Sequence, residues 1–337
     1  MPTIADVARA AGVSIATVSR VLSPGALPHP VRAETAARVR AAARELNFLP
    51  SPMARGLASR RSGLIGLLVP DLADPHYPQI AAGVEDGARG AELAVLICNT
   101  FGDAHRMLEY VLLMQARRVD AIVLSGGTSL NPDELLALND CKLPMVLIGR
   151  PTAAVRWPYV HIDNRAGALQ ATWHLLDIGR TRVLHVAGPG SQTTMADRAA
   201  GYREAMQAAD LTADVITSDG TPRDGYQRLK ARFGNQGRKP DAIFAATDRL
   251  AVAALAVAAD RHLHVPRELA VVGFDDIALA AQLRPSLSTI AQPAYELGTV
   301  AIHMARRLIA GESVEPVSLP VGLMARESTL GPGGRYT

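Results

Sequence analysis

The amino-terminal stretch of the chain decides its fold, and residues 3–22 read TIADVARAAGVSIATVSRVL. Thr3 and Asp6 have the spacing of a capping box, which fixes the start of a first helix. Gly12 can take the left-handed conformation that ends this helix and turns the chain sharply. Ser14 is then placed to cap a second helix. The stretch therefore predicts two short helices joined by a tight turn.

Apolar side chains occupy one face of each predicted helix, so the two faces can pack together. They are Val7, Ala8, Ala11, Val18, Val21 and Leu22. The outward face of the second helix is left to Ile15, Ala16, Ser19 and Arg20. Short side chains allow a helix to approach the major groove of DNA closely. The pattern therefore favours a helix-turn-helix in which the second helix meets DNA.

The side chains of this face divide by the kind of DNA contact that they can make. Arg20 can pair with guanine, and Ile15 and Ala16 can contact a thymine methyl group. Hydroxyl groups are better suited to phosphates, which position the protein without specifying sequence. The candidates of this second kind are Thr17 and Ser19, and Thr3 and Ser14 complete the DNA-binding candidates of the head.

The stretch resembles the heads of the LacI/GalR family of bacterial repressors. Those heads read Asp-Val-Ala, then Ala-Gly-Val-Ser, then Thr-Val-Ser-Arg-Val, and these pieces occur here in that order at residues 6–8, 11–14 and 17–21. A third helix is expected over residues 31–46, with Phe48 closing the small core. The resemblance implies a three-helix DNA-binding head that ends near residue 50.

A short hinge helix is predicted directly after this head. Ser51 followed by Pro52 has the pattern of a helix cap and first helical position, but a helix this short that contains Gly56 is marginal alone. In the family that the head resembles, the equivalent segment orders on operator DNA and its leucine enters the minor groove. The resemblance implies a hinge and linker at residues 51–62, with DNA contacts from Ala54, Arg55 and Leu57.

Charge is distributed unevenly along the 337 residues. Residues 1–62 contain nine arginines, no lysine and three acidic residues, a net charge of +6 that leaves −3 for the rest of a chain whose overall charge is +3. A basic head on a mildly acidic body favours a polyanion as the partner of the head.

The composition is that of a globular protein, with 48% hydrophobic and 20% charged residues. The chain begins without the pattern of a signal peptide, and it has no apolar run long enough for a membrane helix. Its two cysteines do not suggest a disulfide framework. We therefore expect a cytoplasmic protein with no membrane partner.

Beyond the linker, short apolar runs alternate with amphipathic helical stretches, the pattern of parallel strands in βαβ units. The runs are residues 64–69, 94–98, 121–124, 145–148, 183–187, 242–245 and 269–272. Roughly ten such strands are too many for one sheet, so two doubly wound α/β lobes are expected.

The body also resembles the same family, at residues 65–72, 163–167, 187–189 and 271–277. The resemblance implies the fold of periplasmic sugar-binding proteins, with a ligand cleft between two lobes in a body of residues 63–330. The expected segments are an N-lobe at residues 63–161 and 291–320, a C-lobe at residues 162–290 and 321–330, and a tail at residues 331–337.

Ligands of such folds bind at the carboxyl ends of strands. Asp275 could accept hydrogen bonds from adjacent hydroxyls, and Arg198 could donate to hydroxyl, carboxylate or phosphate oxygens. Both match ligand contacts of the family, and the resemblance adds Tyr77, where an aromatic ring often stacks on the ligand. Asp248 is either a cleft residue or only the cap of the helix that it begins. Arg150, at the end of another strand, completes the effector-binding candidates.

An enzyme is the main competing class, and the sequence argues against it. Gly188-Pro189-Gly190 follows a strand but lacks the third glycine of a dinucleotide-binding loop. His262 and His264 lack a third metal ligand. We therefore expect no catalytic residue, no cofactor and no metal.

The expected function is repression of transcription, by a homodimer that binds a palindromic operator with a central CG step and responds to a small metabolite. Thr247, Gly149 and Gln192 depart from the family patterns that accompany lactose-like and purine ligands. A monosaccharide, sugar acid or related polyol is the expected effector. The alternative is a corepressor-type regulator that responds to a non-sugar metabolite or a protein partner.

Overall fold

The computed structural model describes residues 2–22, 31–48, 61–126, 132–150, 157–190, 193–234 and 239–331. The chain divides into two compact units: the first ends at Gly63 and includes Arg118–Asp120, and the second comprises the rest. The first unit contains three helices, and the second carries two six-stranded sheets. Within the described ranges, no helix has the length and apolar character needed to cross a membrane.

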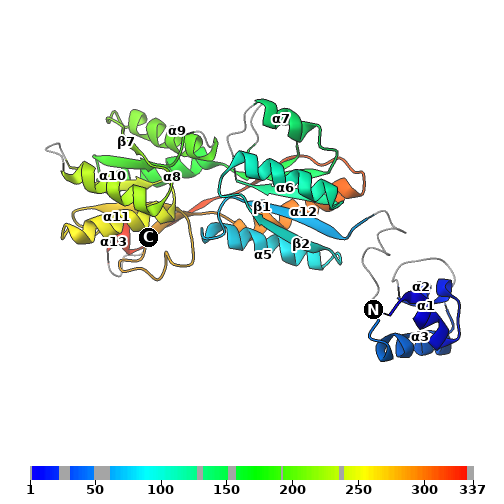
Figure 1. Cartoon of the computed structure of the whole chain (residues 1–337). Helices are drawn as coiled ribbons and strands as arrows, with labels where there is room; N and C mark the ends of the chain where they lie inside the picture. Colours follow the sequence, from blue (N-terminus) through cyan, green and yellow to red (C-terminus); the bar gives the residue numbers. More distant parts are fainter. Residues whose placement is uncertain are drawn as a thin grey trace. The chain divides into compact units, whose positions relative to one another are not determined.

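Three helices form the head, drawn in blue in Figure 1. They are α1 (Ile4–Ala11), α2 (Ile15–Leu22) and α3 (Ala33–Glu45). The predicted capping box is present, because the Asp6 amide donates to the Thr3 hydroxyl at 3.3 Å and the Thr3 amide donates to the Asp6 carboxylate at 2.9 Å. Gly12 ends α1 with a φ of 63°, the left-handed conformation that glycine adopts without strain.

The head has its own small core, built from the apolar faces of the three helices. Its buried members are Val7, Ala8, Ala11, Val18, Val39, Ala42 and Ala43. Phe48 packs against this cluster from the segment that follows α3, together with Leu22 and Leu46. The packing fixes α2 against α1 and α3 and leaves its other face to solvent.

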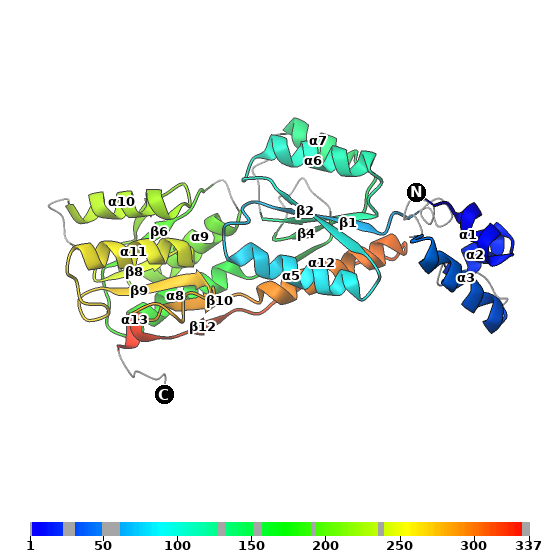
Figure 2. The same ribbon diagram turned by 60° about the horizontal axis from the view of Figure 1, so that its bottom comes forward.

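Six parallel strands form the sheet of the N-lobe. Across the sheet they are β11 (Val317–Leu319), β5 (Tyr159–Ile162), β4 (Met145–Ile148), β3 (Ala121–Ser125), β1 (Leu64–Val69) and β2 (Ala94–Asn99). Parallel sheets need cover on both faces. Here α6 (Ala104–Ala116) and α7 (Pro132–Asn139) lie on one face, and α5 (His76–Arg89) and α12 (Ala294–Ile309) lie on the other (Figure 2).

Two glycines allow α5 and α12 to pack closely. A Cβ atom at Gly83 would lie 2.0 Å from the Tyr295 carbonyl oxygen, and one at Gly298 would lie 2.1 Å from the Ile80 carbonyl oxygen. Each helix thus meets the backbone of the other through a glycine. This contact fixes α12, although its residues lie far along the chain from the rest of the N-lobe.

A second sheet forms the C-lobe, and its strands are parallel except for β12, which is antiparallel to β10. Across the sheet they are β12 (Gly322–Met324), β10 (Ser288–Ala291), β9 (Ala270–Asp275), β8 (Ala242–Ala245), β6 (Val183–Ala187) and β7 (Asp214–Thr217). The helices of this lobe are α8 (Asn164–Asp177), α9 (Thr193–Ala208), α10 (Pro222–Gly234), α11 (Asp248–Asp260) and α13 (Glu327–Leu330).

Strand β8 illustrates why the sheet is covered on both faces. Ala242 and Phe244 belong to the core cluster that contains residues of α8 and α9, whereas Ile243 and Ala245 belong to the cluster with residues of α10 and α11. Alternate side chains of a strand point to opposite faces, so an unbroken apolar run needs helices on both. Each of the seven apolar runs predicted to be strands contributes a strand to one of the two sheets.

The described chain passes between the two lobes at three places. It leaves the N-lobe sheet after β5, returns from β10 to α12, and crosses again between β11 and β12. These connections bring the carboxyl ends of strands from both sheets to a shared cavity, which contains the candidate ligand site.

Candidate functional site

The outward face of α2 is open to solvent in the structure. Ile15 is 51% exposed, and Ala16, Ser19 and Arg20 are exposed as well, while Val18 is fully buried in the head core. Arg20 makes no ion pair within the described part of the chain, so its guanidinium is available to another molecule. The face combines small and apolar side chains with one free cation, which suits a DNA groove.

The hydroxyl residues at the start of the head helices take part in capping. The Ser14 hydroxyl accepts from the Thr17 amide at 3.2 Å and lies 2.9 Å from the Thr17 hydroxyl. The Thr3 hydroxyl donates to the Asp6 carboxylate at 2.7 Å. These residues therefore have a structural role in addition to the DNA contact that the sequence predicts. The hinge candidates Ala54, Arg55 and Leu57, and also Gln192, lie outside the described residues.

A cavity of about 250 Å³, lined by both polar and apolar residues, lies between the two lobes. Its walls come from segments that follow strands of both sheets, as expected for open parallel sheets. The polar lining residues are Asp71, Asp74, His76, Tyr77, Ser125, His161, Asn164, Thr194, Arg198, Asp219, Thr221, Thr247, Arg249, Asp275 and Gln292. Of the five effector candidates from the sequence, the cavity brings together Tyr77, Arg198 and Asp275.

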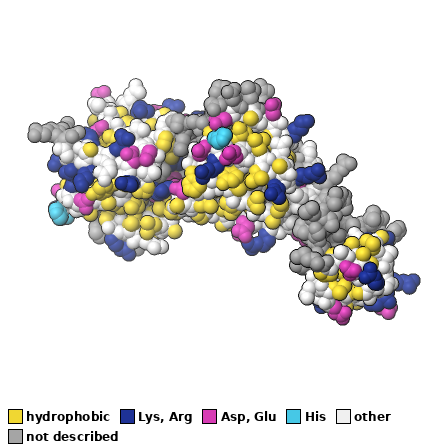
Figure 3. Space-filling view, viewed as in Figure 1, with side chains coloured by type: hydrophobic (Ala, Val, Ile, Leu, Met, Phe, Trp, Pro, Cys, Tyr) yellow, Lys and Arg dark blue, Asp and Glu magenta, His cyan; other side chains and the backbone are white. Residues whose placement is uncertain are grey.

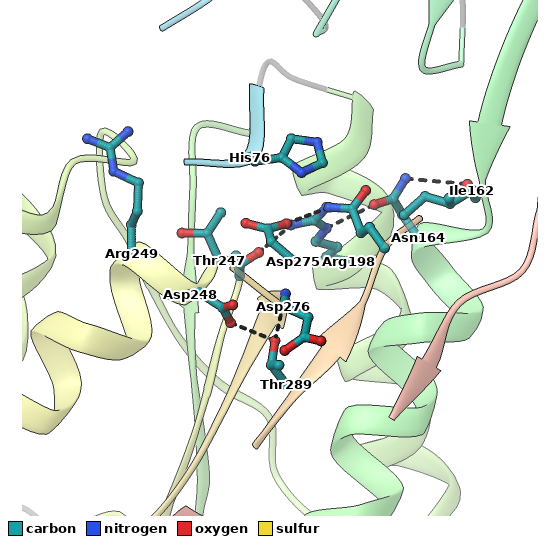
Figure 4. Close-up of polar contacts among 12 residues, drawn as sticks. His76, Ile162, Asn164, Arg198, Thr247, Asp248, Arg249, Asp275, Asp276 and Thr289 are labelled. Atoms are coloured by element: carbon teal, nitrogen blue, oxygen red, sulfur yellow. Dashed lines mark hydrogen bonds and ion pairs between the residues drawn. The ribbon is translucent and has the colours of Figure 1, made fainter. Parts of the chain in front are cut away.

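Arg198 and Asp275 form a buried ion pair, with Arg198 Nη1 3.4 Å from Asp275 Oδ1. The Arg198 guanidinium stacks on the Phe274 ring at 3.6 Å and donates from Nε to Asn164 Oδ1 at 2.9 Å, and from Nη1 to the Ala246 carbonyl. Figure 4 shows the guanidinium and the carboxylate side by side, below the His76 ring. These contacts hold the pair in one orientation.

The pair keeps hydrogen-bonding groups for a ligand. Gln292 also donates to Asp275 Oδ1, so the partners of Asp275 converge on a single oxygen. Within the described residues, Asp275 Oδ2 and Arg198 Nη2 have no hydrogen-bond partner. Burial raises the pKa of Asp275 above its ordinary value, although the charges of Arg198 and His76 act in the opposite direction. The free oxygen and the free nitrogen can accept from one hydroxyl and donate to another.

The backbone that presents Asp275 is strained. Asp275 has a φ of 123° and Asp276 has a φ of 55°, values that are rare for residues other than glycine. The Asp276 carboxylate pairs with Arg326 at 2.7 Å, and its amide donates to the Thr289 hydroxyl at 3.4 Å. Strained backbone of this kind persists only where the surroundings fix it, and it gathers at functional sites.

Asp248 is not a lining residue of the cavity, so the expectation that it faces the ligand is corrected. The carboxylate is fully buried; it accepts from the Thr289 hydroxyl at 2.6 Å and from the Ile277 amide at 2.9 Å. It is not the helix cap either, because the Thr247 hydroxyl accepts from the Leu250 amide. A Cβ atom at residue 273 would lie 2.2 Å from Asp248 Oδ1, which explains why this position is occupied by glycine, Gly273. Asp248 therefore fixes the loop behind the site.

Arg150 also lies outside the cavity lining, to which the preceding residues Ile148 and Gly149 contribute. Its side chain is 54% exposed, and its guanidinium pairs with Asp197 of α9 at 2.7 Å. The Thr193 hydroxyl donates to its carbonyl oxygen. Arg150 thus links the two lobes and does not face the ligand cavity, which corrects the second expectation.

His76 is a cavity residue that sequence reasoning missed. Among the described residues its buried Nδ1 has no hydrogen-bond partner, and its ring meets the Tyr77 ring edge-on at 5.3 Å. Burial lowers the pKa of His76, despite the opposing charges of Asp275 and Asp74. The sequence signal for His76 is its place beside Tyr77 in Pro75-His76-Tyr77.

Arg249 is a second cavity residue that the sequence did not single out. It pairs with Asp71 at 3.1 Å and with Asp74 at 3.2 Å. Burial acts against its charge, but the two carboxylates outweigh that effect and raise the pKa of Arg249. No sequence pattern joins residues 178 positions apart, so only the fold reveals this cluster.

Two stretches of the chain match known protein families. Residues 3–51 match the bacterial regulatory proteins of the lacI family, and residues 172–329 match the periplasmic binding protein-like domain. The chain is 36% identical to the ribose operon repressor of Halalkalibacterium halodurans, over 98% of both chains.

Solved structures are similar over nearly the whole length. The lac repressor dimer bound to operator and the anti-inducer ONPF has a TM-score of 0.87 at 27% identity, covering 97% of this chain and 99% of that one. A complex of the transcriptional regulator CelR with cellobiose has a TM-score of 0.69 at 32% identity, covering 97% of this chain and 100% of that one. The similarity therefore includes the head and both lobes.

Proposed function

Because the chain belongs to the LacI family of bacterial regulatory proteins, we propose that it represses transcription at an operator under the control of a small, sugar-like metabolite. The family consists of transcriptional regulators and not of enzymes. The observation that carries the proposal is the combination, in one chain, of an exposed α2 face with a cavity that keeps unfilled hydrogen-bonding groups. Residues 1–50 would bind DNA, residues 51–62 would form the hinge and linker, and residues 63–330 would bind the effector.

Operator recognition would rest on α2. Arg20, Ile15 and Ala16 are exposed and would read base edges, and Arg20 would contribute about 1–3 kcal/mol of discrimination through guanine. Hydroxyl residues and the hinge would position the head on phosphates and in the minor groove. These further contacts would come from Thr3, Ser14, Thr17, Ser19, Ala54, Arg55 and Leu57.

The effector would bind between Asp275 and Arg198, with Tyr77 beside it. A carboxylate oxygen and a guanidinium nitrogen that both lack partners among the described residues suit neighbouring hydroxyl groups. The cavity volume of about 250 Å³ lies below the roughly 300–1,000 Å³ typical of pockets for larger ligands, which favours a molecule near the size of a monosaccharide. Two relatives support a sugar: a ribose operon repressor, and a regulator solved with cellobiose.

A homodimer is expected because one α2 reads only half of a palindromic site. The N-lobe offers an apolar face for a second copy. Leu96 and Ile97 lie on the edge strand β2, and Leu112 and Leu113 lie on α6; each of these four side chains is more than 40% exposed. Figure 3 shows hydrophobic side chains gathered over this part of the N-lobe. Apolar patches of this kind often mark protein interfaces.

The experiment that tests the proposal selects binding sites from random double-stranded DNA with the purified full-length protein. We expect an imperfect palindrome with a central CG step, bound much more tightly than either half alone. A pool without sequence enrichment, or equal affinity for half and full sites, would contradict the proposal. Sedimentation of Leu112→Asp/Leu113→Asp, which should be monomeric, checks the apolar face separately.

A further inference from the structure

A cluster of charged residues links the two lobes across the cavity. Arg249 is the second residue of α11 in the C-lobe, and it reaches Asp71 and Asp74, which follow β1 in the N-lobe. Its Nη1 lies 3.1 Å from Asp71 Oδ2 and 3.2 Å from Asp74 Oδ2. All three residues line the cavity, and their side chains are partly buried. We call these three residues the clasp.

The clasp uses the positive charge that an anionic ligand would need. Arg198 is the other arginine that lines the cavity within the described ranges, and it is paired with Asp275. Among the described lining residues there is no lysine. The carboxylates outnumber the two arginines, and they belong to Asp71, Asp74, Asp219 and Asp275. The cavity therefore has more negative than positive charge.

From this arrangement we propose that Asp71 and Asp74 set the charge preference of the ligand site: by holding Arg249, they exclude anionic ligands and admit uncharged ones. A phosphate or carboxylate would have to compete with two carboxylates for one guanidinium, in a partly buried place where charges interact more strongly than in water. The effector class is then a neutral sugar or polyol and not a sugar phosphate or sugar acid. The inference rests on the proposed function, since it takes the cavity as the effector site.

The first test compares matched sugars in wild type and Asp71→Asn/Asp74→Asn. Ribose is paired with ribose 5-phosphate, and glucose with glucose 6-phosphate and gluconate, with thermal shift and calorimetry as readouts. Wild type is expected to bind only uncharged members. The double variant frees Arg249, so its affinity for anionic members should rise by at least about tenfold, the ratio that corresponds to 1.4 kcal/mol. Wild type that prefers an anionic member to its neutral partner would overturn the inference.

Asp219→Asn is the matched control. Asp219 lines the cavity, and its carboxylate accepts from the Thr221 amide at 2.8 Å without pairing with Arg249. This variant lowers the negative charge of the cavity while the clasp stays intact. Its gain of anion binding should be much smaller than that of the double variant, because Arg249 stays paired; a gain equal to that of the double variant would show that Arg249 is not the determinant.

A second test uses inorganic phosphate and does not depend on the identity of the sugar. The Tm in phosphate is compared with the Tm in sodium chloride of equal ionic strength, which separates site binding from general salt stabilisation. We expect no difference for wild type, an increase for Asp71→Asn/Asp74→Asn, and loss of that increase when Arg249→Gln is added. An increase in wild type that Arg249→Gln removes would overturn the inference, as would no increase in the double variant.

Circular dichroism of each variant without ligand confirms folding, and Asp74→Asn alone replaces the double variant if that does not fold. The two tests also separate the inference from the proposed function. If no sugar stabilises any variant while the phosphate results hold, the sugar effector fails and the role of the clasp stands. If a neutral sugar binds but the expected differences in Tm with phosphate are not observed, the proposed sugar effector is supported and the clasp does not determine the charge preference.

Discussion

At the residue scale, Asp248 and Asp275 act as a pair of carboxylates with different tasks. Asp275 faces the cavity from a backbone conformation that costs of order 1–3 kcal/mol. Asp248 lies behind it, fully buried, and accepts from Ile277, which follows the strained segment, and from Thr289, which accepts from the Asp276 amide. The hydrogen bonds of one carboxylate thus stabilise the position of the other.

Substitution Asp248→Ala should lower both stability and effector affinity. The Thr289 hydroxyl and the Ile277 amide would lose their acceptor, at roughly 1–3 kcal/mol for each buried group left unpaired. Asp248→Asn keeps one acceptor oxygen, so it should lose less stability and less effector affinity than Asp248→Ala. Urea unfolding and effector titration of the two variants measure the difference. Equal losses in both would show that these hydrogen bonds do not hold the loop.

His185 gives the C-lobe a pH dependence of its own. The ring is fully buried between Tyr202 and Phe244, and its Nδ1 donates to the Phe244 carbonyl at 2.9 Å. Burial lowers the pKa of His185 from 6.5 to about 4. Between these values the unfolded chain binds more protons than the folded one, so stability is lost as the pH falls. The loss amounts to as much as about 3 kcal/mol.

The expected result is a free energy of unfolding that decreases between pH 6.5 and 4, with a smaller decrease in His185→Phe, which keeps a ring in the stack. Urea unfolding at pH 7, 5.5 and 4.5 measures both slopes. The same slope in wild type and variant would assign the acid sensitivity to other groups.

At the scale of single elements, the head could be predicted almost completely from the sequence. The signals for α1, the turn and α2 are local: a capping box, a glycine and a capping serine, each within four residues of its partner. Local signals do not depend on the rest of the fold, so the structure reproduces them. Asp248 was misplaced for the opposite reason, because its surroundings come from β9, β10 and the loop between them.

Arg20→Ala should relax base preference at one position of each half-site. The loss is expected to be about 1–3 kcal/mol against the preferred sequence and smaller against others, since Arg20 would form a bidentate pair only with the preferred guanine. Competition gel shifts with single-base variants of the operator measure it. A uniform loss at all sites would assign Arg20 to phosphate contacts.

The pair of helices α5 and α12 makes a stability prediction. Gly83→Ala would force a methyl group against the Tyr295 carbonyl and should cost about 1–3 kcal/mol, as overpacking usually does. Gly90→Ala is the control, because the nearest atoms to its Cβ are 3.8 Å away and the backbone is helical. Urea unfolding of both variants checks the contact; equal stability would contradict the close packing.

At the scale of the whole molecule, the sequence predicts two lobes because the apolar runs are too many for one sheet, and the fold confirms it. Arg198 and Asp275 were predicted because each lies in a family motif. The clasp was not, since its meaning depends on residues brought together from distant segments of both lobes, and His76 was missed although it lies beside Tyr77 in the sequence. Arg150 was misplaced because the direction of a side chain at the end of a strand cannot be inferred from the strand alone.

Control of DNA binding by a ligand in the inter-lobe cavity is the central proposal for this protein. The most direct measurement is fluorescence anisotropy of the selected operator while neutral sugars are titrated into wild type and Asp275→Ala. We expect that at least one sugar that stabilises wild type also changes its operator affinity, and that Asp275→Ala no longer responds to that sugar. A response of equal size in Asp275→Ala, or a stabilising sugar without effect on operator affinity, would contradict ligand control through the cavity.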